Sequence, residues 1–126
     1  MNNFTNEFRV MLNTENYERM TAFYRDTLGL ESYYHWDYAQ NDRGAKYQCG
    51  AGTVEVIQQE PPCALGPNWI IVESADVDAC YQELVDKGCD FTEEIMTHPY
   101  GVRAFQIADP DGNRVGIFSY LNKEGA

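Results

Sequence analysis

The sequence predicts an α+β fold in which two βαβββ modules form curved mixed sheets around a cleft. Two observations carry this prediction. A short apolar strand followed by an amphipathic helix occurs twice, in residues 8–31 and again in residues 69–88. Each helix ends near a glycine and is followed by alternating strands joined by turns. We therefore expect a single domain over residues 1–126, with a first module at 8–60 and a second at 67–120.

The first helix is expected at about residues 16–28. Asn16 is a candidate N-cap, and Glu18 places a carboxylate in the first turn, where the helix dipole favours it. Gly29 lies where a left-handed C-terminal residue belongs. The apolar stripe follows helical spacing and comprises Tyr17, Met20, Tyr24 and Leu28.

The second helix is expected at about residues 76–87. It begins after Asp76, a preferred N-cap residue, and ends before Gly88. Its buried stripe comprises Val77, Cys80, Leu84 and Val85. Both helices are amphipathic, as expected for helices that cover one face of a sheet.

The expected strands alternate between two faces. In the first strand, Phe8, Val10 and Leu12 share one face and Arg9, Met11 and Asn13 share the other. The same alternation occurs around 53–57, 69–73 and 114–118. Residues 109–113, with the sequence DPDGN, form a strong turn, and the proline-containing stretch Glu60–Asn68 is the expected connector between modules.

Composition and charge exclude several function classes. Apolar residues make up 44% of the chain, so it can build a core, and 20 acidic against 9 basic residues give a net charge of −11. Because the few basic residues are scattered, nucleic-acid binding is not expected. The acidic residues either form a well-solvated surface or create a field that attracts cations. We see no signal peptide and no membrane-spanning segment, and we expect a cytoplasmic protein whose four cysteines are reduced thiols.

Three motifs together resemble a known superfamily. AFYRDTLGLE at residues 22–31, DKG at 86–88 and FQIADPDGN at 105–113 are similar to the vicinal oxygen chelate superfamily. That group includes glyoxalase I, bleomycin-resistance proteins, extradiol dioxygenases and fosfomycin-resistance enzymes. The resemblance covers residues 8–120 and implies the two-module fold. It does not choose among the chemistries that the fold supports.

The resemblance also implies where a metal would be bound. Metal-using members carry one ligand on the first strand and one on the last strand of each half. These positions fall on Arg9 and Glu55 in the first half, and on Trp69 and Gly116 in the second. Only Glu55 is a liganding residue type, because arginine does not deprotonate in proteins and tryptophan and glycine side chains offer no donor. We therefore expect no metal, no cofactor and no catalytic residue.

Among members without a metal, the bleomycin-resistance proteins are most similar in their acidity and in the stretch PNWIIVESADVDA at residues 67–79. They are dimers that sequester a bulky cationic antibiotic. Trp69 would then be a stacking surface for a flat ligand, or would simply fill the space of the metal. Further candidate ligand contacts are Trp36, Phe105, Phe118 and Glu73, although aromatic residues on strands are also ordinary sheet packing.

Arg9 is the least ordinary residue of the first strand. A buried arginine must be paired, and Glu55 is its natural partner because both map to the ligand positions of the first half. The alternative is that Arg9 binds a carboxylate of the ligand. The roles of His35 and His98 stay open.

The sequence therefore favours a homodimeric small-molecule binding protein that sequesters a cationic or aromatic compound without a metal. The alternative is a metal-dependent glyoxalase-like lyase or dioxygenase, which the fold allows and which Arg9, Trp69 and Gly116 disfavour. A third possibility is a metal-free enzyme with Glu55 as the base. Pairing with Arg9 would oppose that role, since it favours the ionised carboxylate.

Overall fold

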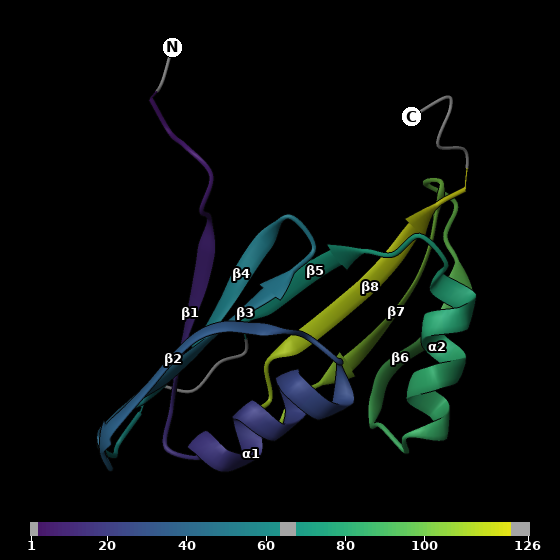
Figure 1. Cartoon of the computed structure of the whole chain (residues 1–126). Coiled ribbons are helices and arrows are strands. Elements are labelled where there is room, and N and C mark those ends of the chain that lie inside the picture. The colour runs from purple at the N-terminus through teal and green to yellow at the C-terminus, as the bar shows by residue number, and fades with distance from the viewer. Residues whose placement is uncertain (1–2, 64–67, 122–126) are drawn as a thin grey trace. The chain divides into compact units, whose positions relative to one another are not determined.

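The computed structural model describes residues 3–63 and 68–121, which fall into two compact units, residues 1–64 and 65–126. Each unit is described by itself, and Figure 1 colours the elements in chain order. The predicted connector Glu60–Asn68 includes residues 64–67, which lie outside the described residues. No helix of the described residues is long and apolar enough to cross a membrane.

The first unit has one helical segment and four strands. Its elements, in chain order, are β1 (Arg9–Thr14), α1 (Tyr17–Ala22), the π-helical turn η1 (Phe23–Thr27), β2 (Ser32–Ala39), β3 (Asp42–Cys49) and β4 (Gly52–Gln58). The strands form one sheet in the order β1-β4-β3-β2. Strand β1 runs parallel to β4, and the other neighbours are antiparallel.

The second unit repeats this plan. Its elements, in chain order, are β5 (Trp69–Glu73), α2 (Val77–Asp86), β6 (Phe91–Thr97), β7 (Val102–Ala108) and β8 (Arg114–Tyr120). The sheet order is β5-β8-β7-β6, again with one parallel pair, β5 and β8, and two antiparallel pairs. The predicted pair of βαβββ modules with mixed sheets is confirmed.

The helices begin and end near the predicted residues, with one correction. Asn16 precedes α1 but makes no side-chain capping hydrogen bond; instead its backbone N–H donates to Thr14 Oγ1 at 2.9 Å. Asp76 does cap α2, because its carboxylate accepts a hydrogen bond from the Ala79 N–H at 3.1 Å. Gly29 and Gly88 end the helices at φ values of 71° and 74°, which favour glycine.

In each unit the helix covers one face of the sheet and buries the alternating apolar residues predicted for it. The buried set of the first unit includes Leu12, Met20, Tyr24, Ala45, Tyr47, Val54 and Val56. That of the second unit includes Ile70, Val77, Leu84, Phe105, Ile107, Val115 and Ile117. Two predictions were wrong. Phe8, expected on the same face as Leu12, precedes β1 and is 76% exposed, and Val85, expected in the buried stripe of the second helix, is 41% exposed.

The predicted turn at residues 109–113 is held by one side chain. The buried Asp109 carboxylate accepts hydrogen bonds from the backbone N–H groups of Asp111 and Asn113, both at 2.9 Å. It also accepts one from Asn113 Nδ2 at 2.7 Å. Gly112, at a φ of 86°, supplies the left-handed residue that the turn needs.

Candidate functional site

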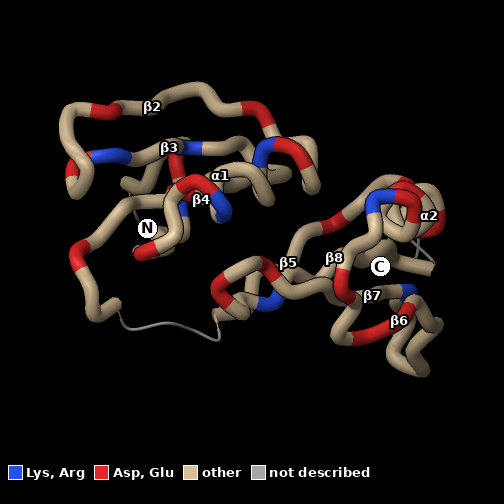
Figure 2. The backbone as a smooth tube through the Cα atoms, turned by 90° about the horizontal axis from the view of Figure 1, so that it is seen from below, with Lys and Arg blue, Asp and Glu red and all other residues tan. Residues whose placement is uncertain are grey.

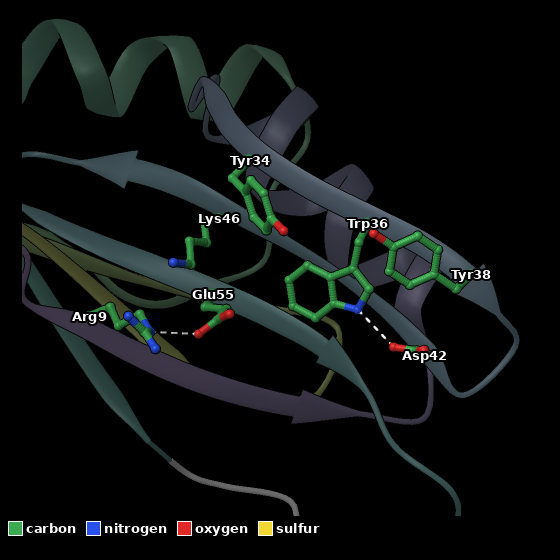
Figure 3. Close-up of a pocket in the computed structure, with 7 residues that line it drawn as sticks. All are labelled: Arg9, Tyr34, Trp36, Tyr38, Asp42, Lys46 and Glu55. Carbon is green, nitrogen blue, oxygen red and sulfur yellow. Dashed lines mark hydrogen bonds and ion pairs between the residues drawn. The ribbon is translucent and has the colours of Figure 1, made fainter.

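The sheet face of the first unit that faces away from the helix carries a pocket of about 330 Å³. Strand register builds it, because Glu55 of β4 lies opposite Lys46 of β3, and Lys46 lies opposite Tyr34 of β2. We call it the Trp36 pocket; it is lined by Arg9, Tyr34, Trp36, Tyr38, Asp42, Lys46 and Glu55 (Figure 3). Its volume is at the lower end of the range for small-molecule sites.

Trp36 lies over the backbone of Gly44, its neighbour on β3. A Cβ atom at Gly44 would come closer than 3.0 Å to three carbon atoms of the indole's six-membered ring, so only glycine leaves room for the ring. The indole Nε1 donates a hydrogen bond to Asp42 Oδ1 at 3.1 Å. Tyr34 packs beside the indole, with 5.9 Å between ring centroids. One end of the pocket is therefore aromatic and fixed in orientation (Figure 3).

The other end of the pocket is charged. Arg9 Nε lies 2.8 Å from Glu55 Oε1, which confirms the predicted ion pair, although the N–H does not point at that oxygen well enough for a hydrogen bond. The Glu55 side chain is only 6% exposed and that of Arg9 is 42% exposed. The guanidinium thus compensates a buried carboxylate from the solvent side.

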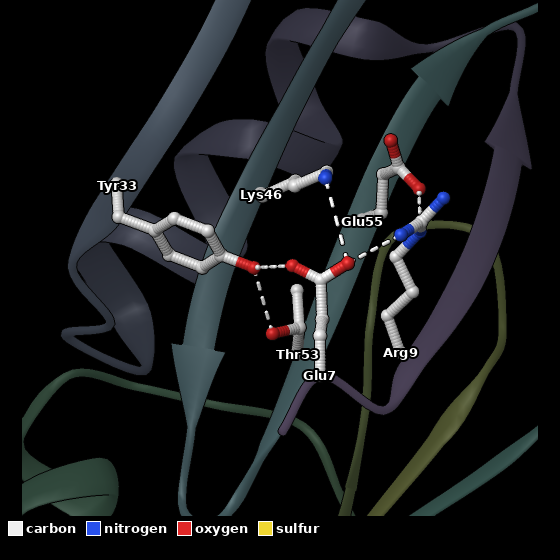
Figure 4. A network of polar contacts seen from close by, with 6 residues as sticks. All are labelled: Glu7, Arg9, Tyr33, Lys46, Thr53 and Glu55. Atoms are coloured by element: carbon white, nitrogen blue, oxygen red, sulfur yellow. Dashed lines mark hydrogen bonds and ion pairs between the residues drawn. The ribbon is translucent and has the colours of Figure 1, made fainter. Parts of the chain in front are cut away.

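A second carboxylate, that of Glu7, joins this charged end (Figure 4). It contacts the Arg9 guanidinium, and its Oε2 lies 3.6 Å from Lys46 Nζ. Its Oε1 accepts a hydrogen bond from the Tyr33 hydroxyl at 2.9 Å, and the same hydroxyl lies 2.9 Å from Thr53 Oγ1. The hydrogen bonds from Tyr33 and then Arg9 lower the pKa of the Glu7 carboxyl below its usual value.

Sequence reasoning missed the roles of Glu7, Tyr33 and Lys46. Strict alternation would place Tyr33 and Tyr34 on opposite faces of β2. Instead, the pairing advances by two residues along β2, from Ser32 to Tyr34, while it advances by one residue along β3. Because of this bulge, the side chains of both tyrosines lie on the same face of the sheet. No short sequence motif predicts such a bulge.

Three of the predicted site residues share a face of the second unit. The register of β5 and β8 sets Trp69 opposite Arg114 and Glu73 opposite Phe118. The side chains of Trp69, Glu73 and Phe118 therefore point to the same side of the sheet. Trp69 is 55% exposed, and the Arg114 guanidinium lies over its ring at 5.4 Å from the centroid. Four strand residues, about 13 Å, separate Trp69 from Glu73. The charge next to this indole is therefore positive, not negative.

Phe105 lies on the opposite face from Phe118. It is fully buried, and its ring packs 5.1 Å from that of Tyr81 on α2 and 5.8 Å from that of Phe91. Position 105 alternates with 104 and 106 on β7, which sends its side chain toward the helix. We therefore leave Phe105 out of the candidate site.

The positions that hold a metal in the resembled superfamily can be compared within each unit. In the first unit β1 pairs with β4 so that Met11 lies opposite Glu55, two residues after Arg9. In the second unit β5 pairs with β8 so that Ile71 lies opposite Gly116, again two residues after Trp69. The registers are equivalent, which supports the pairing of Arg9 with Trp69 and of Glu55 with Gly116 as matching positions.

The residues at these four positions do not fit a metal. Arg9 and Trp69 offer no ligand, and the carboxylate of Glu55 is compensated by Arg9. Gly116 has space for a side chain, since a Cβ there would meet nothing closer than 3.7 Å, but it has no donor. Among residues 3–63 and 68–121, no group of three or more His, Cys, Asp or Glu side chains could hold a metal ion.

Neither histidine is among the residues that line the Trp36 pocket. His98 is half-buried; its Nε2 lies 3.4 Å from Glu93 Oε1, and its ring stacks on that of Tyr100 at 4.9 Å. His35 is exposed on β2 and lies opposite Ala45. Acidic residues, coloured red in Figure 2, are spread along both units rather than gathered at one site.

Comparisons with known proteins agree with this fold. A family model described as the Glyoxalase/Bleomycin resistance protein/Dioxygenase superfamily matches residues 8–117. A comparison with curated protein sequences finds no match. Among solved structures, TioX from Micromonospora sp. ML1 is 23% identical with a TM-score of 0.78, over 91% of this chain and 98% of that chain.

Two further solved structures show the range of the group. TnmS3, an antibiotic binding protein from Streptomyces sp. CB03234, is 19% identical with a TM-score of 0.79, over 95% of this chain and 99% of that chain. A lactoylglutathione lyase from Agrobacterium tumefaciens is 19% identical with a TM-score of 0.71, over 94% of this chain and 96% of that chain. At these identities the likeness shows the fold alone. Because the family model spans most of the sequence, the chain belongs to the Glyoxalase/Bleomycin resistance protein/Dioxygenase superfamily.

Proposed function

We propose that this protein binds and sequesters a small molecule with a flat aromatic ring, in the cytoplasm and without a metal, and that the Trp36 pocket holds the ring. The observation that carries the proposal is the placement of Trp36. The indole is fixed over Gly44, hydrogen-bonded to Asp42 and flanked by Tyr34, on the face of the sheet opposite to α1. Aromatic side chains fixed in this way form stacking surfaces for flat ligands.

The chemistry of the pocket favours binding over catalysis. The Glu55 carboxylate lies 2.8 Å from Arg9 Nε and its side chain is only 6% exposed, so little of it is open to a substrate. A metal-dependent lyase or dioxygenase needs a donor set, and three of the four corresponding positions carry Arg9, Trp69 and Gly116. TnmS3, which is described as an antibiotic binding protein, has the same fold, and this is compatible with a sequestering role here.

The charge of the ligand is a separate question from its ring. The net charge of −11 favours the approach of cations at long range. Arg114 over the Trp69 ring argues against a cationic ligand stacked there, since one cation already lies against that indole. Stacking on Trp69, with Glu73 and Phe118 on the same sheet face, stays a prediction.

Calorimetric titration with 2-naphthamide, a neutral flat probe, and with bleomycin, a cationic one, tests the proposal. We expect binding that is unchanged by EDTA, and an affinity that falls by about tenfold in Trp36→Leu, which corresponds to about 1.4 kcal/mol. Trp69→Leu tests the second stacking prediction in the same way: wild-type affinity in this variant would exclude Trp69 as the stacking surface for the probe. Absence of binding, or equal binding by Trp36→Leu, would overturn the proposal. Loss of binding on removal of a stoichiometric metal would revive the lyase or dioxygenase alternative.

We also propose that the protein is a homodimer. Large apolar side chains are exposed on the sheets, including Met11 at 53%, Trp69 at 55% and Ile71 at 65%. A second copy would cover such surface, and closed twofold pairing is the commonest way to do so. Sedimentation equilibrium at micromolar concentration should give twice the chain mass, and Ile71→Glu should shift the protein toward the monomer. A wild-type monomer under these conditions would exclude the dimer.

A further inference from the structure

We propose that Arg9, Lys46 and Tyr33 form a carboxylate-binding subsite at the charged end of the Trp36 pocket, and that the Glu7 side chain occupies it in the free protein. The inference rests on the proposed aromatic ligand and adds that this ligand carries a carboxylate beside its ring. On binding, the ligand's carboxylate replaces that of Glu7.

Three donors from three parts of the first unit converge on the Glu7 carboxylate (Figure 4). The Tyr33 hydroxyl of β2 donates to Oε1 at 2.9 Å, and the Arg9 guanidinium of β1 donates to Oε2. The Lys46 ammonium of β3 lies 3.6 Å from Oε2. A carboxylate offers two oxygens that only accept, and a guanidinium, an ammonium and a phenol hydroxyl are suitable donors for it. The structure therefore already shows a carboxylate in this place.

Glu7 is an occupant that can leave. It lies in the segment before β1, and its side chain is 40% exposed. In the described part of the chain, its carboxylate is held by the side chains of Arg9, Lys46 and Tyr33. Hydrogen bonds from Tyr33 and Arg9 lower its carboxyl pKa, so the surroundings favour a negatively charged group over a neutral acid. An exposed side chain can swing into solvent, where water replaces these hydrogen bonds.

The charges left behind favour an anion. Without Glu7, Arg9 and Lys46 share one carboxylate at this end of the pocket, that of Glu55. The other carboxylate of the lining, Asp42, lies at the aromatic end and accepts the hydrogen bond of the Trp36 indole, so one positive charge at the charged end is uncompensated. Lys46 carries three N–H donors, yet its distance to Glu7 is longer than an ordinary hydrogen bond. Its side chain is only 19% exposed, so water screens this charge less than it screens a surface lysine. The ammonium can thus move closer to a better-placed acceptor.

The subsite lies within reach of the aromatic end. Tyr34 lies opposite Lys46, and Trp36 lies opposite Gly44, two residues further along β3. Two strand residues span about 7 Å. A two-ring aromatic acid stacked at Trp36 can bridge that distance and place its carboxylate between Lys46 and Arg9, which line the same pocket.

Three probes with one ring system test the subsite: 2-naphthoate, 2-naphthamide and 2-naphthylmethylammonium, titrated by calorimetry. We expect the wild type to bind naphthoate more tightly than naphthamide, and the ammonium probe most weakly. Glu7→Gln should tighten naphthoate binding by about threefold to tenfold, since the internal competitor has lost its charge. Lys46→Met keeps the side chain's length and should abolish the preference for naphthoate over naphthamide.

Lys87→Met is the control, because it removes the same charge from the end of α2 in the other unit, and it should leave the preference intact. If naphthamide binds but naphthoate binds no tighter in the wild type and in Glu7→Gln, the subsite is wrong and the aromatic pocket stands. If Lys87→Met abolishes the preference as Lys46→Met does, general charge accounts for it and the subsite is wrong. If none of the three probes binds the wild type or Glu7→Gln, the proposed function is wrong, and the subsite that rests on it is wrong as well.

Discussion

A single methyl group added at Gly44 is expected to displace Trp36 and abolish most of the aromatic binding. The Cβ of Gly44→Ala would lie closer than 3.0 Å to three atoms of a rigid ring. Strand β3 cannot retreat easily, because Gly44 pairs with Trp36 on one side and with Ile57 on the other. The indole must therefore move and give up its hydrogen bond to Asp42. We expect an affinity for 2-naphthamide at least tenfold lower, and a loss of stability of about 1–3 kcal/mol from overpacking.

Gly116→Ala is the matched control for this variant. It adds the same methyl group to a strand glycine, but its Cβ would meet Ile71 and Gln106 at ordinary distances of 3.7 and 3.8 Å. We expect affinity close to that of the wild type and a change in stability within about 0.5 kcal/mol. Titration of both variants, with the Trp36 indole N–H followed by NMR, compares the two positions. An unmoved indole resonance and wild-type affinity in Gly44→Ala would contradict the close approach.

The fold could be predicted because its signals are local and occur twice. The spacing of Met20 and Tyr24 gives a helical stripe, Gly29 and Gly88 end their helices, and alternation separates core from open face on each strand. The turn at 109–113 depends on residue types whose backbone preferences are known from sequence alone. Asn16 has a preferred N-cap residue type but its side chain makes no capping hydrogen bond, and residue type alone does not fix the orientation of that side chain.

The site could be predicted only in part, since it depends on register. The pairing of Arg9 with Glu55 was predicted from a buried arginine that needs a partner. The pair is present, but the premise was wrong, because Glu55 is the buried partner and the Arg9 side chain is 42% exposed. The fit of Trp36 over Gly44 depends instead on which residues of β2 and β3 are opposite each other, and a one-residue shift would separate them. Glu7 lies before the first strand, where no periodicity marks it. The sequence favoured Trp69 over Trp36 as the stacking surface. In the structure the two indoles differ by the charge beside them, since Trp36 donates to Asp42 and Trp69 lies under Arg114.

Replacing Arg9 is expected to destabilise the protein far more than removing the charge of Glu55. Arg9→Met leaves the Glu55 side chain, which is only 6% exposed, without the cation 2.8 Å away, and a buried carboxylate without compensation is costly. Glu55→Gln leaves the guanidinium, which is partly exposed and can turn to water and to Glu7, so its effect should be about 1 kcal/mol or less. This asymmetry separates a compensating cation from a simple surface pair.

Urea unfolding of the two single variants and of the double variant Arg9→Met/Glu55→Gln measures this difference in stability. The double variant should recover most of the stability that Arg9→Met loses, because the amide no longer needs a cation. Arg25→Met is the control: its pair with Asp26 is as short, at 2.8 Å, but both side chains are more than half exposed, so its loss should leave the unfolding midpoint nearly unchanged. Equal midpoints for Arg9→Met and Arg25→Met would mean that Arg9 does not compensate Glu55, and that the carboxylate at this superfamily position is free to take another partner.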